Sequence, residues 1–237
     1  LGSALALADY LAQQGKIVPV FISTPVPQQY CRLVRVSQCT TDRSLFKNSE
    51  IDLVLVFDCS DSEFVRSLVQ ECPSHPFVIN IDHHKTNNHY GHLNQIVIDA
   101  CATAAIVHRF FEANQLIPSR DAATCLLTGL CFDTGTFSNS ATNERALETA
   151  SKLLLQGARI QDVIQVLFYS RSIAALRVWG LALERLEENV QEGMITTYLT
   201  RKDIEQNHVP ADDIAGLSNC LNLVTDMEML RVLRETP

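Results

Sequence analysis

The sequence contains no hydrophobic run long enough to cross a membrane. A transmembrane helix needs roughly 18 uninterrupted apolar residues, and the apolar stretch Leu1–Ala8 is followed at once by Asp9. No segment shows a charged region followed by an apolar core, which is typical of a secretory signal. We therefore expect a cytoplasmic protein with no membrane partner.

A Cys-x-x-Cys pair and an excess of positive charge are also missing. The eight cysteines lack the spacing of zinc ribbons, and most lie in apolar runs, where a reduced thiol behaves as a small hydrophobic side chain. With 19 Lys and Arg against 27 Asp and Glu, the net charge is −8. This argues against a protein that tracks long polyanions, but not against one that binds a small phosphate ester through divalent cations.

The hydrophobic patterns that are present predict an α/β fold. Up to residue 135, helix and strand patterns alternate at the spacing of right-handed crossovers, which indicates a mostly parallel sheet flanked by helices. Strands are expected at 17–22, 33–36, 53–57, 76–81 and 96–98, with helices at 2–14 and 62–71. Helices then follow at 100–115, 119–132, 143–156, 160–169 and 172–188, before a strand at 194–199 and a helix start at 212–214.

These patterns divide the chain into three parts. We expect a larger α/β domain at 1–170, a linking helix at 171–190 and the start of a smaller α/β C-terminal domain at 191–237. The last segment is too short to form a core of its own. The helix Ser172–Glu188 could also mediate a homodimer, but the sequence does not distinguish an exposed face of this helix from a core face.

Three apolar runs end on metal-ligand side chains. Leu53–Phe57 leads into Asp58, Pro76–Ile81 into Asp82-His83-His84, and Leu126–Phe132 into Asp133. Ligands of open α/β sheets bind at the carboxyl ends of the strands, and carboxylate with imidazole suits Mn²⁺, with Mg²⁺ as the alternative. We interpret the pattern as a two-ion site of a metal-dependent phosphoesterase, with Asp58, His83 and Asp133 as metal ligands.

The neighbouring residues suggest further roles. His84 fits phosphate contact or proton delivery to the departing oxygen, and Asp82 fits the carboxylate that orients an imidazole. Asn87 would hold the loop or touch substrate, while Thr134 and Gly135 fit a turn that contacts phosphate. Taken singly, Asp58 and Asp133 could instead be ordinary turn or cap residues.

Together these residues resemble the motifs of the DHH phosphoesterase superfamily. Val56–Asp58 matches its second motif, Asp82–His84 its third and Gly129–Gly135 its fourth, while Leu1–Ser3 matches the tail of the first. Within the superfamily the chain looks most like the NrnA type of bifunctional oligoribonuclease and 3′-phosphoadenosine-5′-phosphate phosphatase. The resemblance implies a DHH domain at 1–170 and a partial DHH-associated, substrate-binding domain at 191–237.

The resemblance also implies a mechanism and a substrate class. A hydroxide bridging two Mn²⁺ ions would attack phosphorus in line, with Asp58 bridging both ions, His83 and Asp133 on one ion or the other, and His84 on the scissile phosphate. Short RNA would give nucleoside 5′-monophosphates, and 3′-phosphoadenosine-5′-phosphate would give AMP. Dinucleotides derived from cyclic-di-AMP are the alternative substrates, while pyrophosphate and polyphosphate would need denser Lys and Arg clamps than this sequence offers.

Two elements of the family pattern lie outside these residues. The family has a His and two Asp just upstream of its first Gly-Ser, and a Gly-rich, His-containing loop in the associated domain. We therefore expect a trimmed chain. A natural protein without both elements would be an inactive nucleotide-binding remnant.

Overall fold

The computed structural model describes residues 1–168, 172–189, 193–209, 217, 221 and 229–235. The chain forms two compact units, Leu1–Leu167 and Phe168–Pro237. Among the described residues, no helix combines the length and the apolar character needed to cross a membrane.

A parallel sheet of three strands forms the centre of the first unit. Its order is β3 (Leu53–Phe57), β4 (Phe77–Asp82) and β5 (Leu93–Ile96). Strands β1 (Val20–Phe21) and β2 (Cys39–Thr40) pair separately and are also parallel. Because β3 and β4 run in the same direction, their carboxyl ends meet at one edge of the sheet.

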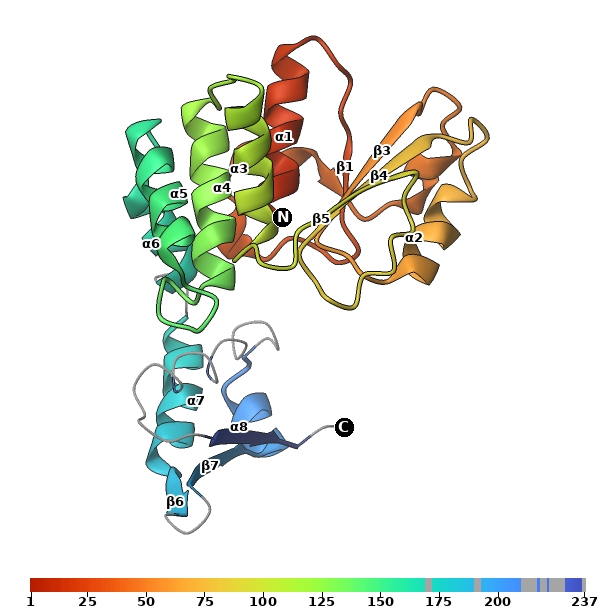
Figure 1. The fold of residues 1–237 in the computed structure, drawn as a ribbon. Helices are drawn as coiled ribbons and strands as arrows, with labels where there is room; N and C mark the ends of the chain where they lie inside the picture. Colours follow the sequence, from red (N-terminus) through yellow and green to blue (C-terminus); the bar gives the residue numbers. More distant parts are fainter. Residues whose placement is uncertain (169–171, 190–192, 210–216, 218–220, 222–228, 236–237) are drawn as a thin grey trace. The chain divides into compact units, whose positions relative to one another are not determined.

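Helices cover this sheet on both sides (Figure 1). Helix α2 (Ser62–Val69) lies on one side and contributes to a small cluster with Phe46 and Cys72. The other side carries α1 (Gly2–Gln13), α3 (Thr103–Ala113), α4 (Arg120–Asp133), α5 (Glu144–Leu155) and α6 (Ile160–Phe168). The predicted α/β architecture, a parallel sheet flanked by helices, is therefore confirmed.

Helix α4 is the central helix of the main core. It packs against α1, α3 and α5, and Leu126, Leu127 and Leu130 on it are fully buried. A Cβ atom at Gly2 would lie 2.2 Å from the carbonyl oxygen of Cys125, so only glycine lets α1 approach α4 this closely. Ser119 caps α4, because its hydroxyl oxygen accepts a hydrogen bond from the backbone N–H of Ala122.

Most predicted elements of the first unit are present, with ends that differ by a few residues. The strand predicted at 33–36 is wrong. This segment is a turn between the short 3-10 helices Gln28–Tyr30 and Val36–Gln38, and Arg35 has a left-handed φ of 62°. Its apolar side chains still face inward, since Leu33 is buried in the main core. The strand predicted at 96–98 lies earlier, at Leu93–Ile96.

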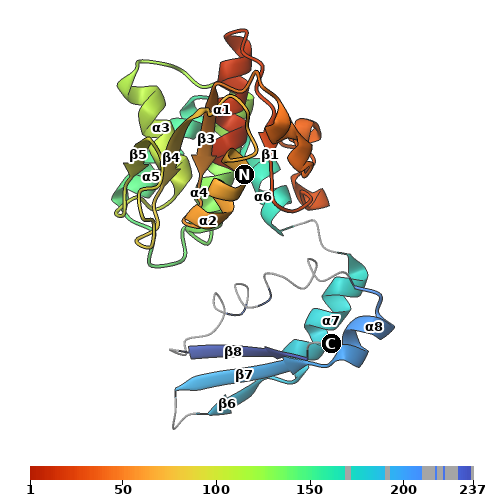
Figure 2. The same cartoon turned by 90° about the vertical axis from the view of Figure 1, so that its right-hand side faces the viewer.

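The second unit combines helices with a small mixed sheet (Figure 2). Its sheet order is β6 (Glu187–Asn189), β7 (Met194–Leu199) and β8 (Met229–Arg234), with β6 antiparallel and β8 parallel to β7. Helix α7 (Ile173–Glu184) and helix α8 (Arg201–Gln206) complete it. The helix predicted at 172–188 thus ends earlier, because Glu187–Asn189 pairs as a strand.

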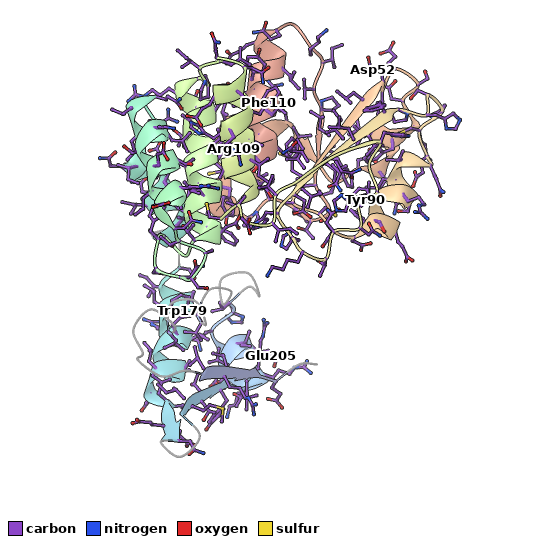
Figure 3. The ribbon with its side chains drawn as sticks, in the orientation of Figure 1. Asp52, Tyr90, Arg109, Phe110, Trp179 and Glu205 are labelled. Atoms are coloured by element: carbon purple, nitrogen blue, oxygen red, sulfur yellow. The ribbon has the colours of Figure 1, made fainter. Side chains whose placement is uncertain are left out.

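Helix α7 belongs to the core of the second unit. Its residues Ala175, Val178, Trp179 and Ala182 are buried in one cluster with Leu199 of β7 (Trp179 is labelled in Figure 3). The division into parts at residues 170 and 190 stays a prediction, and the helix start expected at 212–214 lies outside the described residues.

Candidate metal centre

The structure brings together acidic and imidazole side chains from three segments. Asp58 follows β3, His83 follows β4, and Asp133 is the last residue of α4. His83 Nε2 lies 3.4 Å from Asp58 Oδ1 and 4.0 Å from Asp133 Oδ2. Three residues that span 75 positions of the sequence thus converge on one imidazole nitrogen.

Strand pairing explains why Asp58 and His83 meet. Phe57 pairs with Ile81 in the parallel ladder, and the N–H of Asp58 donates to the Ile81 carbonyl oxygen at 3.0 Å. Asp58 then takes a left-handed φ of 59°, which is uncommon for a residue with a side chain and is a feature found at functional sites. The chain therefore turns sharply at the residue whose carboxylate enters the cluster.

The second nitrogen of His83 fixes how its ring is oriented. His83 Nδ1 lies 3.1 Å from the carbonyl oxygen of Ala100, which can only accept, so Nδ1 carries the proton. This leaves Nε2 directed at Asp58 and Asp133. Metal-binding histidines usually have this arrangement, in which a carbonyl or carboxylate holds the other ring nitrogen.

Asp82 is enclosed and fully hydrogen-bonded. Its Oδ1 accepts from His84 Nδ1 at 2.7 Å and from the backbone N–H of His83 at 2.7 Å. Its Oδ2 accepts from the Asn87 side-chain amide at 2.7 Å. Asp58, Asp82, His83 and His84 each offer a possible ligand atom, all within 4.8 Å of one another. Since Asp82 is 0% exposed and its oxygens are occupied, we interpret it as the residue that orients His84.

His84 is the more open of the two histidines. Its side chain is 48% exposed, against 19% for His83, and the two rings meet edge-on with centroids 4.6 Å apart. Because Asp82 accepts the Nδ1 proton, His84 Nε2 is free to face a ligand.

The charges of the cluster are strongly coupled. Hydrogen bonding with Asp58 raises the pKa of His83 to about 9, against the opposing effect of burial. The same contact lowers the pKa of Asp58, helped by Thr103. Burial, followed by repulsion from Asp58, raises the pKa of Asp133 to about 6. Without a cation, a proton therefore stays on His83, in the position that a metal ion would take.

Asn87 and Thr134 have structural hydrogen bonds. The Asn87 amide donates to Asp82 and to the Cys59 carbonyl oxygen, at 2.7 and 3.2 Å, so it holds the loop. Thr134 is 0% exposed, and its hydroxyl donates to the Leu130 carbonyl oxygen at 2.7 Å. Gly135 has a left-handed φ of 56° in the turn beside Asp133. The geometry gives no support to substrate contact by the Thr134 hydroxyl.

Two residues that support the site had no role assigned from the sequence. Thr103 Oγ1 donates to Asp58 Oδ1 at 2.9 Å, and the buried Asn80 amide donates to Asn87 Oδ1 at 2.8 Å. Asn80 lies in the middle of β4, where a buried amide on an apolar strand is a signal that could have been noticed. The contact of Thr103 with Asp58 could not be anticipated from the sequence, because it spans 45 positions.

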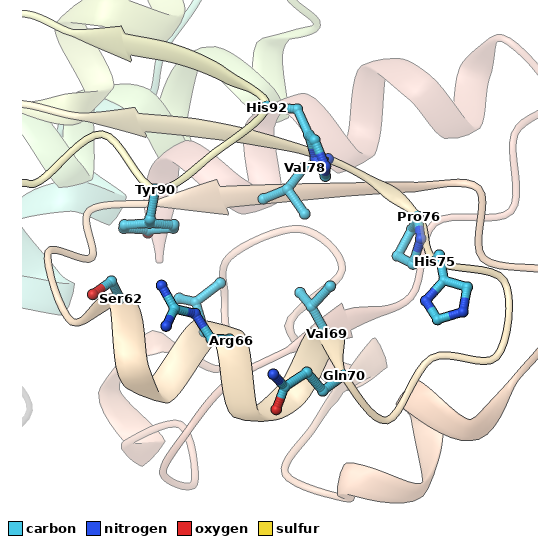
Figure 4. A pocket seen from close by; sticks show the side chains of 10 residues that line it. Ser62, Arg66, Val69, Gln70, His75, Pro76, Val78, Tyr90 and His92 are labelled. Atoms are coloured by element: carbon cyan, nitrogen blue, oxygen red, sulfur yellow. The ribbon is translucent and has the colours of Figure 1, made fainter.

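A pocket of about 350 Å³ lies between α2 and the sheet (Figure 4). The residues that line it include the apolar Val65, Val69 and Val78 as well as Arg66 and Tyr90. The Tyr90 hydroxyl donates to the Cys59 carbonyl oxygen at 2.7 Å. None of the proposed metal ligands lines this pocket, so it is separate from the metal centre.

Comparison with known proteins identifies the family. Residues 1–130, more than half of the chain, match the model of the DHH family, N-terminal domain. The chain belongs to the DHH family. The matched region contains Asp58 and the Asp82–His84 tripeptide, and it ends three residues before Asp133.

Two curated relatives carry the NrnA name. The bifunctional oligoribonuclease and PAP phosphatase NrnA of Thermus thermophilus is 30% identical over 151 residues, which is 64% of this chain and 46% of the relative. A probable bifunctional oligoribonuclease and PAP phosphatase NrnA of Streptococcus mutans is 35% identical over 108 residues, 46% of this chain and 34% of the relative. The chain thus spans less than half the length of these DHH relatives.

A solved structure shares the fold across nearly the whole chain. An exopolyphosphatase-related protein from Bacteroides fragilis superposes with a TM-score of 0.87 at 21% identity, covering 97% of this chain and 71% of that one. At this identity the likeness establishes the fold alone.

Proposed function

We propose that this DHH-family chain is part of a metal-dependent phosphoesterase that hydrolyses short oligoribonucleotides to nucleoside 5′-monophosphates, or 3′-phosphoadenosine-5′-phosphate to AMP. The observation that carries the proposal is the position of His83 Nε2 between two carboxylates, while the Ala100 carbonyl oxygen holds Nδ1. Similarity to the two NrnA relatives supports the substrate class.

The donor set fits a divalent transition ion. Two carboxylate groups and one imidazole nitrogen combine the ligands preferred by Mn²⁺, with Mg²⁺ as a weaker alternative because of the imidazole. Asp58, His83 and Asp133 would hold the ions, and Asp58 would contact both. When bound, a pair of such ions polarises a phosphoryl group and lowers the pKa of water.

The chain's own residues position the metal ligands and the side chain that would contact the substrate. Thr103 and the Ala100 carbonyl oxygen fix Asp58 and His83, so that both ligands are in place before an ion arrives. Asp82 holds His84 with its Nε2 free, where it would contact the scissile phosphate or deliver a proton to the departing oxygen. Gly135 would let the turn beside Asp133 approach the phosphate closely, while Asn87 serves the substrate indirectly through Asp82.

The test uses the natural full-length protein with Mn²⁺. An RNA dinucleotide and 3′-phosphoadenosine-5′-phosphate are supplied separately, and release of the monophosphate is followed. Turnover should be lost when a chelator removes the metal ions. It should fall by at least about a hundredfold in Asp133→Asn, because this substitution removes one of the proposed carboxylate ligands. The exposed Asp52→Asn is the matched control and should retain full activity.

Other outcomes would redirect the proposal. Turnover of linear dinucleotides derived from cyclic-di-AMP, with neither of the two proposed substrates, would assign the alternative substrate class. Binding of Mn²⁺ without hydrolysis of any of these three substrates would contradict the proposed enzymatic activity and would indicate an inactive nucleotide-binding remnant.

A further inference from the structure

The pocket between α2 and the sheet has no part in the metal centre described above. Its volume of about 350 Å³ falls at the lower end of the range of small-molecule sites, which is roughly 300–1,000 Å³. Side chains normally fill the space between a helix and the sheet that it covers. An open space of this size between α2 and β4 is therefore a candidate site for a small ligand.

Two opposite walls of the pocket are apolar. Val69 belongs to α2 and Val78 to β4, and Figure 4 shows them on opposite sides of the open space. Val65 and Pro76 also line the pocket, and both are buried. A space between two apolar walls fits a flat, largely apolar ring, because burying the ring removes apolar surface from water on both of its sides.

Arg66 gives the pocket a positive charge that no neighbouring carboxylate neutralises. Within the described part of the chain, its guanidinium group forms no ion pair and no hydrogen bond, although Glu63 lies three positions before it on α2. None of the described residues that line the pocket is acidic. In a protein with a net charge of −8, this unpaired guanidinium favours an anion, because its planar fork pairs with carboxylate or phosphate oxygens.

Two aromatic residues of the lining are held in place by hydrogen bonds. His92 Nδ1 accepts from the backbone N–H of Val78 at 2.9 Å, so the ring is neutral and carries its proton on Nε2. The His92 ring also stacks on Phe77, with centroids 5.0 Å apart. The Tyr90 hydroxyl donates to the Cys59 carbonyl oxygen, which holds the aromatic ring at the edge of the pocket (Figure 4). The site thus offers a donor and an aromatic surface before a ligand arrives.

We propose that this pocket binds a small molecule with one flat apolar ring and one anionic group, a carboxylate or a phosphate monoester. The anion would pair with Arg66, and the ring would lie between Val69 and Val78. His92 Nε2 would donate to a polar atom of the ligand. The site is distinct from the metal centre, and the proposal does not rest on the proposed phosphoesterase activity.

The test is calorimetric titration of the natural full-length protein in the presence of a chelator, so that neither metal binding nor turnover contributes. The probes are two matched pairs, indole-3-carboxylate with indole-3-carboxamide and adenosine 5′-monophosphate with adenosine. At least one of the two anions should bind with a Kd below about 1 mM. Its uncharged partner should bind at least about tenfold more weakly. The two pairs report separately whether the pocket accepts a carboxylate or a phosphate monoester.

Three variants locate the bound anion and ring. Arg66→Gln should weaken binding of the anion at least about tenfold and leave binding of its uncharged partner unchanged. Arg109→Gln removes the same charge at an exposed position of α3 and should leave the Kd unchanged. Val69→Phe places a larger side chain in the pocket and should weaken the anion and its uncharged partner alike.

Four results would overturn the proposal. The first is that neither anion binds with a Kd below about 1 mM. The second is that the uncharged partner binds as tightly as its anion, and the third is that Arg66→Gln leaves the Kd of the anion unchanged, which would place the ligand elsewhere. Urea unfolding of the unliganded variants checks that they fold. Val69→Phe tests the position of the ring independently of the charge, so unchanged binding in this variant is the fourth, even if Arg66→Gln did not fold.

Discussion

Asp82→Asn is the change that tests most directly whether one buried carboxylate holds the loop after β4. Asp82 is 0% exposed. Its Oδ1 accepts from the backbone N–H of His83 and from His84 Nδ1, both at 2.7 Å, and its Oδ2 accepts from Asn87 at 2.7 Å. Asparagine has the same shape but only one acceptor oxygen, so in either orientation a donor meets a donor.

The expected decrease in the free energy of unfolding follows from the less costly of the two orientations of the new side-chain amide. With the new oxygen toward the two histidines, the new amide faces Asn87. Asn87 cannot reverse its own amide without losing the bonds that its Oδ1 accepts from Asn80 at 2.8 Å and from the backbone N–H of His89 at 3.0 Å. One charge-assisted bond is lost and a buried donor is left unpaired, so the free energy of unfolding should fall by about 2–4 kcal/mol.

The assay is urea unfolding of the metal-free protein, followed by far-ultraviolet circular dichroism. The only tryptophan of the sequence, Trp179, lies in α7, so its fluorescence reports the second unit separately. The exposed Asp52→Asn makes the same chemical change and should shift the free energy by less than about 0.5 kcal/mol. If Asp82→Asn stayed within the same 0.5 kcal/mol of wild type, the proposed role of the carboxylate would be refuted.

Three further changes test other parts of the first unit. Thr103→Val removes the hydroxyl that donates to Asp58 and should weaken Mn²⁺ binding by about tenfold or more in calorimetry; an unchanged affinity would contradict the supporting role. In the metal-free protein, the pKa of Asp133 of about 6 lies above its ordinary 3.8. The folded protein therefore holds the Asp133 proton more tightly than the unfolded chain does. For this reason the free energy of unfolding should fall as pH rises from about 4 to 6. Asp133→Asn should remove about 1–3 kcal/mol of this fall, and equal pH profiles for the two proteins would refute it. Gly2→Ala would bring a methyl group to 2.2 Å from the Cys125 carbonyl oxygen and should lower the free energy of unfolding by about 1–3 kcal/mol; an unchanged urea midpoint would count against the close packing of α1 and α4.

The elements that the sequence predicted well are those with a local hydrophobic pattern. Helix α4 and strand β4 match their expected ranges closely, because helix and strand periodicity can be read from neighbouring residues. The segment 33–36 shows where this fails. Its apolar alternation is typical of a strand, yet Leu33 is buried although it lies in a turn. The reason is that a hydrophobic pattern indicates which side chains face inward but not which backbone conformation they belong to.

The convergence of Asp58, His83 and Asp133 could also be anticipated. Each ends an apolar element, and parallel strands bring their carboxyl ends to one edge. The roles of these residues stay predictions until the variants are measured. The tautomer of His83 could not be anticipated, because the Ala100 carbonyl oxygen that fixes it lies 17 positions away.

The sequence by itself determined the fold class, the DHH motif and the residue types of the metal centre, because these depend on local pattern and on side-chain chemistry. Only the tertiary structure decided which side chains serve as supports. It assigned Thr103 to Asp58, committed the Thr134 hydroxyl to the Leu130 carbonyl oxygen, and separated the buried face of α7 from its exposed one. The physical reason is that hydrogen-bond partners and exposure depend on segments that are distant in the sequence and meet only when the core has packed.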